Sequence, residues 1–203
     1  MKQDFSKYRV LTFDCYGTLI DWEKGIWDAL RPILTENDRL DLTKASALQQ
    51  FAALESHQQS AAPSMRYASV LETVHARFAL DNELATTDEM NGKFAKSIED
   101  WPSFPDSADA LRSLQRRYKL VILSNVDRAG FAASNRKLGV EFDAIYTAED
   151  IGSYKPDLRN FKYMLRHLHN DFGFEKCDIL HVAQSLHHDH APARELELAN
   201  VWI

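Results

Sequence analysis

Four polar side chains of this sequence could do chemistry together: Asp14, Ser124, Lys155 and Asp189. Each follows a predicted strand or stands at the start of the helix beside one. Because the carboxyl ends of parallel strands meet at one rim of a sheet, we expect the four to lie close together. Two carboxylates, a hydroxyl and an ammonium group at such a rim are typical of a catalytic site. Singly, each also has a plainer explanation as a turn former, a solvated lysine or a helix N-cap.

A parallel sheet is needed to position these groups. The run 10–13 is β-branched and aromatic without helical spacing, which predicts a buried strand, and Gly17 permits the sharp turn after it. Later segments alternate between two patterns, predicting strands at 119–123, 142–146, 179–182 and 200–203 and helices at 106–118, 127–138, 155–169 and from 191 to about 198. This order predicts an α/β fold, with a Rossmann-like parallel sheet core flanked by helices.

An all-helical cap is predicted to interrupt this core after its first strand. No strand pattern occurs between residues 21 and 100, and the apolar residues there recur at helical spacing. The predicted core domain is therefore discontinuous, covering 1–20 and 101–203, and the predicted cap domain covers 21–100.

Local signals within the cap predict its helices. Thr43 and Ser64 are expected to cap two of them, and 87–98 to form another. The polar segment 56–64 is expected to be a loop, and Pro32 is expected to kink or split the first helix.

Composition excludes several classes of protein. The 203 residues carry a net charge of -6, which argues against broad binding to nucleic acid or anionic membranes. Cys15 and Cys177 lie far apart and give neither a disulfide framework nor a zinc motif. No apolar signal core or membrane-length run is evident, so a cytoplasmic location is expected.

A family resemblance rests on four blocks of sequence: 14–18 (Asp-Cys-Tyr-Gly-Thr), Ser124-Asn125, Lys155-Pro156 and 185–189. Together these blocks resemble the haloacid dehalogenase (HAD) superfamily over essentially the whole chain, and most nearly its type II 2-haloacid dehalogenase branch. Within that branch, the Asp-Cys-Tyr-Gly-Thr-Leu-Ile-Asp-Trp and Gly-Ser-Tyr-Lys-Pro segments resemble those of azetidine-2-carboxylate hydrolases.

The resemblance implies roles for the shared residues. Asp14 would be the nucleophile and Lys155 would stabilise charge, while Asp189 would orient Lys155 or activate water. Binding of an anion or intermediate is implied for Thr18, Ser124 and Asn125, and further substrate contacts are expected from Tyr16, Trp22, Ser185 and His188. A cation about 4 Å from Asp14 would favour its ionised form by about 4 kcal/mol at an effective dielectric near 20. Relatives in this branch are commonly dimers, so a homodimer is expected.

Two positions separate attack on carbon from phosphatase chemistry. HAD phosphatases typically carry a general-acid Asp two residues after the nucleophile and a magnesium-binding Asp in the fourth motif, where this chain has Tyr16 and Gln184. A missing general acid typically costs about 10²–10⁴ in rate, and a neutral amide binds magnesium less well than a carboxylate. We therefore expect hydrolysis without metal or cofactor at a carbon of a small 2-substituted carboxylic acid, through an aspartyl ester.

Other readings stay open. Type II dehalogenases carry an Arg early in the cap, but 48–59 contains none, which leaves open a ring-opening hydrolase of the azetidine-2-carboxylate type. A magnesium-dependent phosphatase and a non-catalytic protein that binds a small acid or a partner are further alternatives. A cluster of histidines occurs at 187, 188 and 190, with His181 nearby, and we expect it to be structural and not to bind a metal ion. Within this cluster, His188 is also a candidate for proton transfer.

Overall fold

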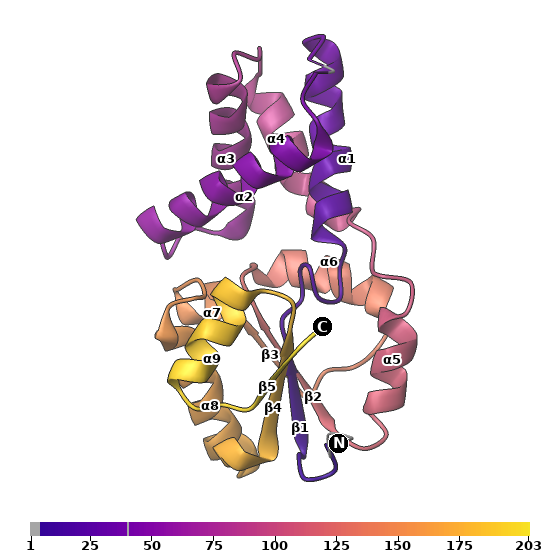
Figure 1. Cartoon of the computed structure of the whole chain (residues 1–203), viewed down its shortest axis with the longest axis vertical. Coiled ribbons are helices and arrows are strands. Elements are labelled where there is room, and N and C mark those ends of the chain that lie inside the picture. The colour runs from indigo at the N-terminus through magenta and orange to yellow at the C-terminus, as the bar shows by residue number, and fades with distance from the viewer. Residues whose placement is uncertain (1–4, 40) are drawn as a thin grey trace.

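A parallel sheet forms the centre of the computed structural model, which describes residues 5–39 and 41–203. Its strand order is β3-β2-β1-β4-β5 (Figure 1). The strands are β1 (Val10–Phe13), β2 (Lys119–Ser124), β3 (Ala144–Thr147), β4 (Ile179–Ala183) and β5 (Asn200–Trp202). All four pairings are parallel, so every carboxyl end lies at the same edge. The predicted Rossmann-like α/β fold is confirmed.

Helices cover both faces of this sheet because alternate strand residues point in opposite directions. In β2, Leu120 and Ile122 join the apolar cluster that includes residues of α5 (Ser107–Leu114) and α6 (Arg128–Leu138). Val121 and Leu123 join a second cluster with α8 (Leu158–Phe172) and α9 (Ala191–Glu195). The short helix α7 (Ala148–Ile151) follows β3.

The stretch between β1 and α5 is helical. It comprises α1 (Trp22–Glu36), α2 (Lys44–Ala61), α3 (Tyr67–Asp81), α4 (Asp88–Lys96) and the 3₁₀ turn Ser97–Glu99. These helices stand over the carboxyl ends of the strands (Figure 1). One apolar cluster runs from Phe13 of β1 to Ile26 of α1 and Phe51 of α2, so the insertion and one sheet face share buried contacts. Division into a core and a cap domain stays a prediction.

Several predicted boundaries were wrong. Helix α2 continues to Ala61 instead of ending before Ser56, because its polar residues face solvent or a cavity and do not break the helix. Arg66, and not Ser64, precedes α3 as its N-cap. Pro32 does not split α1, whose apolar face is buried on both sides of it. Two helices also end early, α5 at Leu114 and α9 at Glu195, and a π-helical turn, Leu186–His190, precedes α9.

No helix in the described part of the chain is long and apolar enough to cross a membrane.

Gly25 of α1 is required by close packing against Trp101. A Cβ atom at Gly25 would lie 2.3 Å from the Cγ atom of Trp101, whose ring is 1% exposed and also makes an edge contact with Tyr16. We expect Gly25→Ala to lower the free energy of unfolding by about 1–3 kcal/mol, because overpacking outweighs alanine's better helix propensity. Urea unfolding would measure this change. Gly92→Ala in α4, where the nearest atom is 3.7 Å away, is the control and should not destabilise.

Candidate active site

A buried lysine joins two buried aspartates at the carboxyl edge of the sheet. The Nζ atom of Lys155 lies 2.9 Å from Oδ1 of Asp14 and 2.6 Å from Oδ1 of Asp189. It also donates to the carbonyl oxygen of Leu123 at 2.9 Å, so three acceptors match the three protons of the ammonium group. Asp14 is 6% exposed, Lys155 2% and Asp189 0%. The structure thus brings together the three residues expected to be catalytic.

Each of the three groups is positioned by a different element. Asp14 directly follows β1, and its backbone N–H bonds to the carbonyl of Val182 in β4. Lys155 precedes α8, and the side-chain amide of Asn125 makes two hydrogen bonds to its backbone. The amide donates to the Lys155 carbonyl at 2.9 Å and accepts from the Lys155 N–H at 2.7 Å. Asp189 lies in the π-helical turn after β4. Asn125, expected to bind substrate, is thus also the residue that places Lys155.

Behind this triad lies a chain of hydrogen bonds that the sequence did not reveal. Nε2 of His181 lies 2.9 Å from Oδ1 of Asp189, and its Nδ1 lies 2.8 Å from the hydroxyl of Thr12. Both residues are fully buried in the central strands. The sequence signal for this pair is limited to two polar residues inside otherwise apolar strands, and the histidine pattern relates His181 only to a possible metal site.

Thr18 completes the setting of Asp14. Its hydroxyl donates to Oδ2 of Asp14 at 2.7 Å and accepts from the backbone N–H of Gln184 at 3.1 Å. Each carboxylate oxygen of Asp14 therefore has one donor, from Thr18 on one side and Lys155 on the other. Such a clamp fixes the plane of the carboxylate.

Burial and charge act against each other on these groups. Burial raises the pKa of Asp14, and Asp189 adds to this, while Lys155 and the hydrogen bond from Thr18 act in the opposite direction. Burial acts to raise the pKa of Asp189 as well, but the charge of Lys155 and the hydrogen bond with His181 hold it at about 2. Burial acts to lower the pKa of Lys155, and the two carboxylates more than offset it. Lys155 and Asp189 are therefore both charged at neutral pH.

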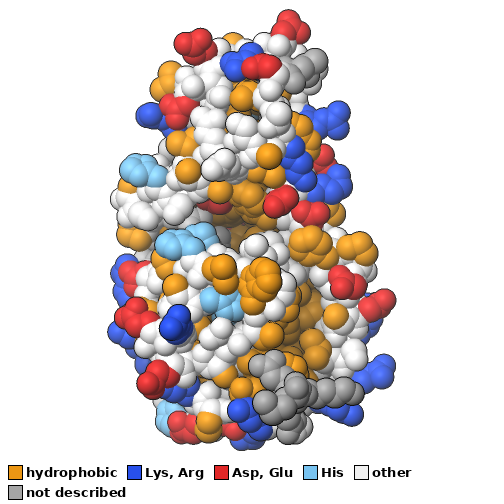
Figure 2. All heavy atoms as spheres, viewed as in Figure 1, with side chains coloured by type: hydrophobic (Ala, Val, Ile, Leu, Met, Phe, Trp, Pro, Cys, Tyr) orange, Lys and Arg blue, Asp and Glu red, His pale blue; other side chains and the backbone are white. Residues whose placement is uncertain are grey.

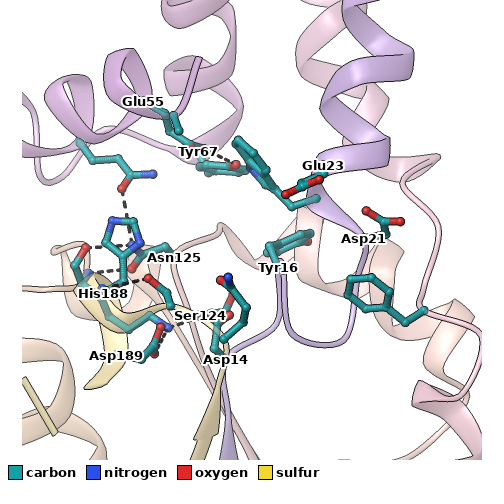
Figure 3. A pocket seen from close by; sticks show the side chains of 18 of the residues that line it. Asp14, Tyr16, Asp21, Glu23, Glu55, Tyr67, Ser124, Asn125, His188 and Asp189 are labelled. Atoms are coloured by element: carbon teal, nitrogen blue, oxygen red, sulfur yellow. Dashed lines mark hydrogen bonds and ion pairs between the residues drawn. The ribbon is translucent and has the colours of Figure 1, made fainter. Parts of the chain in front are cut away.

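The triad forms the floor of a cavity of about 610 Å³ between the sheet edge and the inserted helices. Figure 2 shows the hollow at this level of the molecule, and Figure 3 shows the side chains around it. Lining residues come from the strand ends and from α1 and α2, with Tyr67 at the start of α3: Asp14, Tyr16, Gly17, Asp21, Trp22, Glu23, Lys44, Ala52, Glu55, Gln59, Tyr67, Phe104, Ser124, Asn125, Lys155, Gln184, Ser185, His188 and Asp189.

The other predicted substrate contacts also lie at this cavity. Ser124 ends β2 and its hydroxyl is buried without a hydrogen-bond partner among the described residues. Ser185 accepts from the backbone N–H of His188 at 3.0 Å. Burial and the nearby charge of Lys155 lower the pKa of His188 to about 4, so its ring is neutral at pH 7. Trp22 begins α1 at the rim, where its ring centroid lies 6.3 Å from that of Phe51. Their roles stay predictions.

The hydroxyl of Tyr16 is engaged away from Asp14. It lies 2.9 Å from the hydroxyl of Ser134 in α6, and burial raises the pKa of the phenol well above its usual value. Tyr16 therefore presents mainly its ring to the cavity.

Sequence reasoning missed the side of the cavity formed by α2 and Tyr67. Glu55, Gln59 and Tyr67 line it, and Figure 3 shows Glu55 and Tyr67 across the space from Asp14. Nothing in their spacing distinguishes them from ordinary polar helix residues.

A magnesium ion fits these donors poorly. Both oxygens of Asp14 already accept hydrogen bonds, one from the ammonium group that would repel a metal cation. Gln184 offers only a neutral amide. Within 5–39 and 41–203, no group of three or more His, Cys, Asp or Glu side chains is arranged to hold a metal ion.

This chain is similar to known proteins over most of its length. A family model for haloacid dehalogenase-like hydrolases matches residues 8–185. No curated protein matches the sequence. Among solved structures, YfnB from Bacillus subtilis, a HAD-family protein bound to magnesium, shares 22% identity at a TM-score of 0.79, covering 97% of this chain and 89% of its own. The L-2-haloacid dehalogenase PA0810 shares 22% identity at 0.77, covering 97% and 84%.

The L-2-haloacid dehalogenase from Xanthobacter autotrophicus, with chloropropionic acid covalently bound, shares 18% identity at a TM-score of 0.79, covering 97% of this chain and 77% of its own. Identities this low show a shared fold. The likeness to azetidine-2-carboxylate hydrolases stays a prediction. With a family model that matches most of its length, the chain belongs to the haloacid dehalogenase-like hydrolases.

Proposed function

We propose that this hydrolase attacks a carbon atom of a small 2-substituted carboxylic acid with the carboxylate of Asp14, forming an aspartyl ester that water then cleaves. The supporting observation is the buried Asp14 carboxylate at the floor of the cavity, clamped by Lys155 and Thr18. The similar fold of a dehalogenase solved with chloropropionic acid covalently bound also supports it.

Alignment is the main contribution of the protein to the first step. A carboxylate is a weak nucleophile, and well-oriented intramolecular attack can supply about 7–11 kcal/mol. One oxygen of Asp14 bonds to the substrate carbon while the leaving group departs with the bonding electrons. Asp14 loses its negative charge as the ester forms, and Lys155 then remains balanced by Asp189 alone. The buried triad thus holds one positive and one negative charge in the ester, whereas it holds one positive and two negative charges in the free enzyme.

The second step regenerates Asp14. Water attacks the carbonyl carbon of the aspartyl ester, and Lys155 stabilises the negative charge that develops on the carbonyl oxygen. The bond from this carbon to the substrate oxygen then breaks, and the substrate oxygen takes up one proton of the attacking water, so the hydroxy acid departs. Oδ2 of Asp189 is buried and accepts no hydrogen bond from the described residues, so it is available to orient this water. With a pKa of about 2, Asp189 orients the water and does not retain a proton from it, so the second proton of the water passes to solvent as the Asp14 carboxylate is regenerated.

Phosphatase chemistry is less well supported by the same residues. The position of the usual general acid holds Tyr16, whose hydroxyl is engaged with Ser134. The position of the usual metal-binding carboxylate holds Gln184. A halide, by contrast, leaves without a proton, so attack on carbon does not need either group.

Oxygen labelling tests this mechanism. In a single turnover with enzyme in excess and ¹⁸O-labelled water, we expect the label in the carboxylate of Asp14 and unlabelled oxygen in the product, measured by mass spectrometry. The two substrates to be tested in parallel are L-2-chloropropionate and L-azetidine-2-carboxylate, each with EDTA present so that any turnover is independent of metal ions. Labelled product with unlabelled Asp14 would rule out the ester. Cleavage of a phosphate ester only on adding magnesium would favour the phosphatase, and binding without any product would favour a non-catalytic protein.

A further inference from the structure

The wall of the cavity opposite Asp14 carries a carboxylate without a cationic partner. Glu55 of α2 accepts a hydrogen bond from the hydroxyl of Tyr67 at 2.5 Å. Its side chain is only partly exposed, and no described Lys, Arg or His forms an ion pair with it. Figure 3 shows the pair facing the space above Asp14 and Ser124.

Both cations that line the cavity are already engaged. Lys155 pairs with Asp14 and Asp189, and Nζ of Lys44 lies 3.8 Å from Oε2 of Glu23. The lining includes five carboxylates and no Arg among the described residues: Asp14, Asp21, Glu23, Glu55 and Asp189. A substrate that carries only a carboxylate would therefore meet net negative charge with no free cation to receive it.

Aromatic rings lie beside the Glu55–Tyr67 pair in the cavity wall, since Tyr67 contacts both Glu55 and Tyr16, and unpaired polar atoms lie at the floor below it (Figure 3). The rings of Tyr16 and Tyr67 lie 6.3 Å apart, and both line the cavity with Trp22. Ring faces of this kind attract organic cations. The Ser124 hydroxyl, in a residue 2% exposed, and Oδ2 of Asp189 are buried without partners among the described residues. Unpaired buried groups in a cavity indicate a polar ligand, independently of the acidic residues.

We propose that Glu55 and the adjacent Tyr16 and Tyr67 rings bind an ammonium group of the substrate, which makes the substrate a small zwitterionic amino acid. This deepens, and rests on, the proposed attack of Asp14 on carbon. The positive charge of the ammonium group offsets the substrate's own carboxylate, so the molecule enters without net repulsion. Ser124 is then free to donate to that carboxylate from the floor. Such recognition needs no Arg in 48–59, in keeping with the sequence.

The ionisation of Glu55 agrees with this assignment. Burial raises its pKa to about 7, against the hydrogen bond from Tyr67, and the groups that interact with it, Tyr67 and Tyr154, stay uncharged. Binding of the ammonium group requires the carboxylate, so affinity should rise as the pH increases through about 7.

Two ligands that differ in one group test the proposal. L-azetidine-2-carboxylate carries a ring ammonium where cyclobutanecarboxylate carries a methylene. We use titration calorimetry at pH 8 with the full-length Asp14→Asn variant, which should bind the first ligand without converting it, and expect it to bind this ligand at least about tenfold more tightly than the second. Adding Glu55→Gln should abolish this preference, whereas adding Glu72→Gln, at an exposed position in α3, should keep it. Glu55→Gln should melt no lower than the wild type at pH 8, since it removes a carboxylate whose ionisation burial disfavours.

Three results would each overturn the proposal: equal binding of the two ligands by Asp14→Asn, an unchanged preference when Glu55→Gln is added, or tighter binding of L-2-chloropropionate than of the amino acid. The labelling of Asp14 reports separately on the proposed function. Label in Asp14 from L-2-chloropropionate, together with indifference to Glu55→Gln, would reject the ammonium site while retaining the ester mechanism.

Discussion

Replacing Asp14 by asparagine should reduce turnover by at least about 10⁴-fold while leaving the fold at least as stable as the wild type. The amide keeps the shape and the contact with Thr18 but cannot form the ester. Steady-state assays on the substrate that labels Asp14 measure the loss. Substrate binding by calorimetry should persist, because the cavity walls are unchanged.

The expected stability of Asp14→Asn follows from the direction in which folding shifts the pKa of Asp14. Burial raises the pKa of Asp14, so its ionisation is less favourable in the folded chain than in the unfolded one. Its contribution to stability therefore falls as pH rises from about 3.9, its unfolded pKa, through the raised folded value. Asparagine removes this cost, and Lys155 keeps Asp189 as a partner. Two results for Asp14→Asn would contradict the role proposed for Asp14: turnover close to that of the wild type, or a clearly lower free energy of unfolding in urea at pH 7.

Sequence reasoning found the floor of the site because strand ends can be read locally. Asp14 and Ser124 each follow an apolar run whose length and residue types predict a buried strand, and parallel order then brings them together. Lys155, at the start of a predicted helix, and Asp189, past the fourth predicted strand, were placed at the same rim, and their roles came from the resemblance to the HAD superfamily. The fold class depends on the same alternation of strands and helices, so it could be predicted with the site.

Residues whose partners come from distant segments could not be found in this way. His181 contacts Asp189 only because a π-helical turn folds back over β4, and nothing in the spacing of residues 181–189 predicts that turn. Glu55 lies in a stretch of α2 adjoining a segment predicted to be a loop, and its contact with Tyr67 depends on how α2 and α3 pack. Polar residues on a helix have the same pattern whether they face solvent or a cavity. Tertiary packing, and not local preference, decides between the two.

Lys155 should matter for stability as much as for catalysis. Replacing it by methionine keeps most of the side-chain volume but leaves Asp14 and Asp189 buried without their shared cation. Removing one partner of a buried ion pair typically costs about 3–5 kcal/mol, so Lys155→Met should lower the free energy of unfolding by about that amount at pH 7. Turnover should fall by at least about 10³-fold, because neither the nucleophile nor the developing oxyanion keeps its charge partner.

The pH dependence identifies the cause of this loss. In the wild type, the pKa of Asp189 is about 2. The ion pair with Lys155 therefore stabilises the fold at every pH above the ordinary pKa of Asp, and this stabilisation is lost only as the pH falls through about 2. Without Lys155 the two buried carboxylates repel each other, so protonation below neutral pH relieves both in the variant. In the wild type it relieves only Asp14, because Asp189 stays ionised down to about pH 2. The difference in free energy of unfolding between the wild type and Lys155→Met, measured with urea, should therefore be smaller at pH 4 than at pH 7. Adding Asp189→Asn to Lys155→Met should restore part of the stability at pH 7 but no turnover, since only one uncompensated charge then remains. A gap that stays constant with pH would mean that Lys155→Met acts through lost packing, and the buried triad would not be the electrostatic unit on which the proposed chemistry depends.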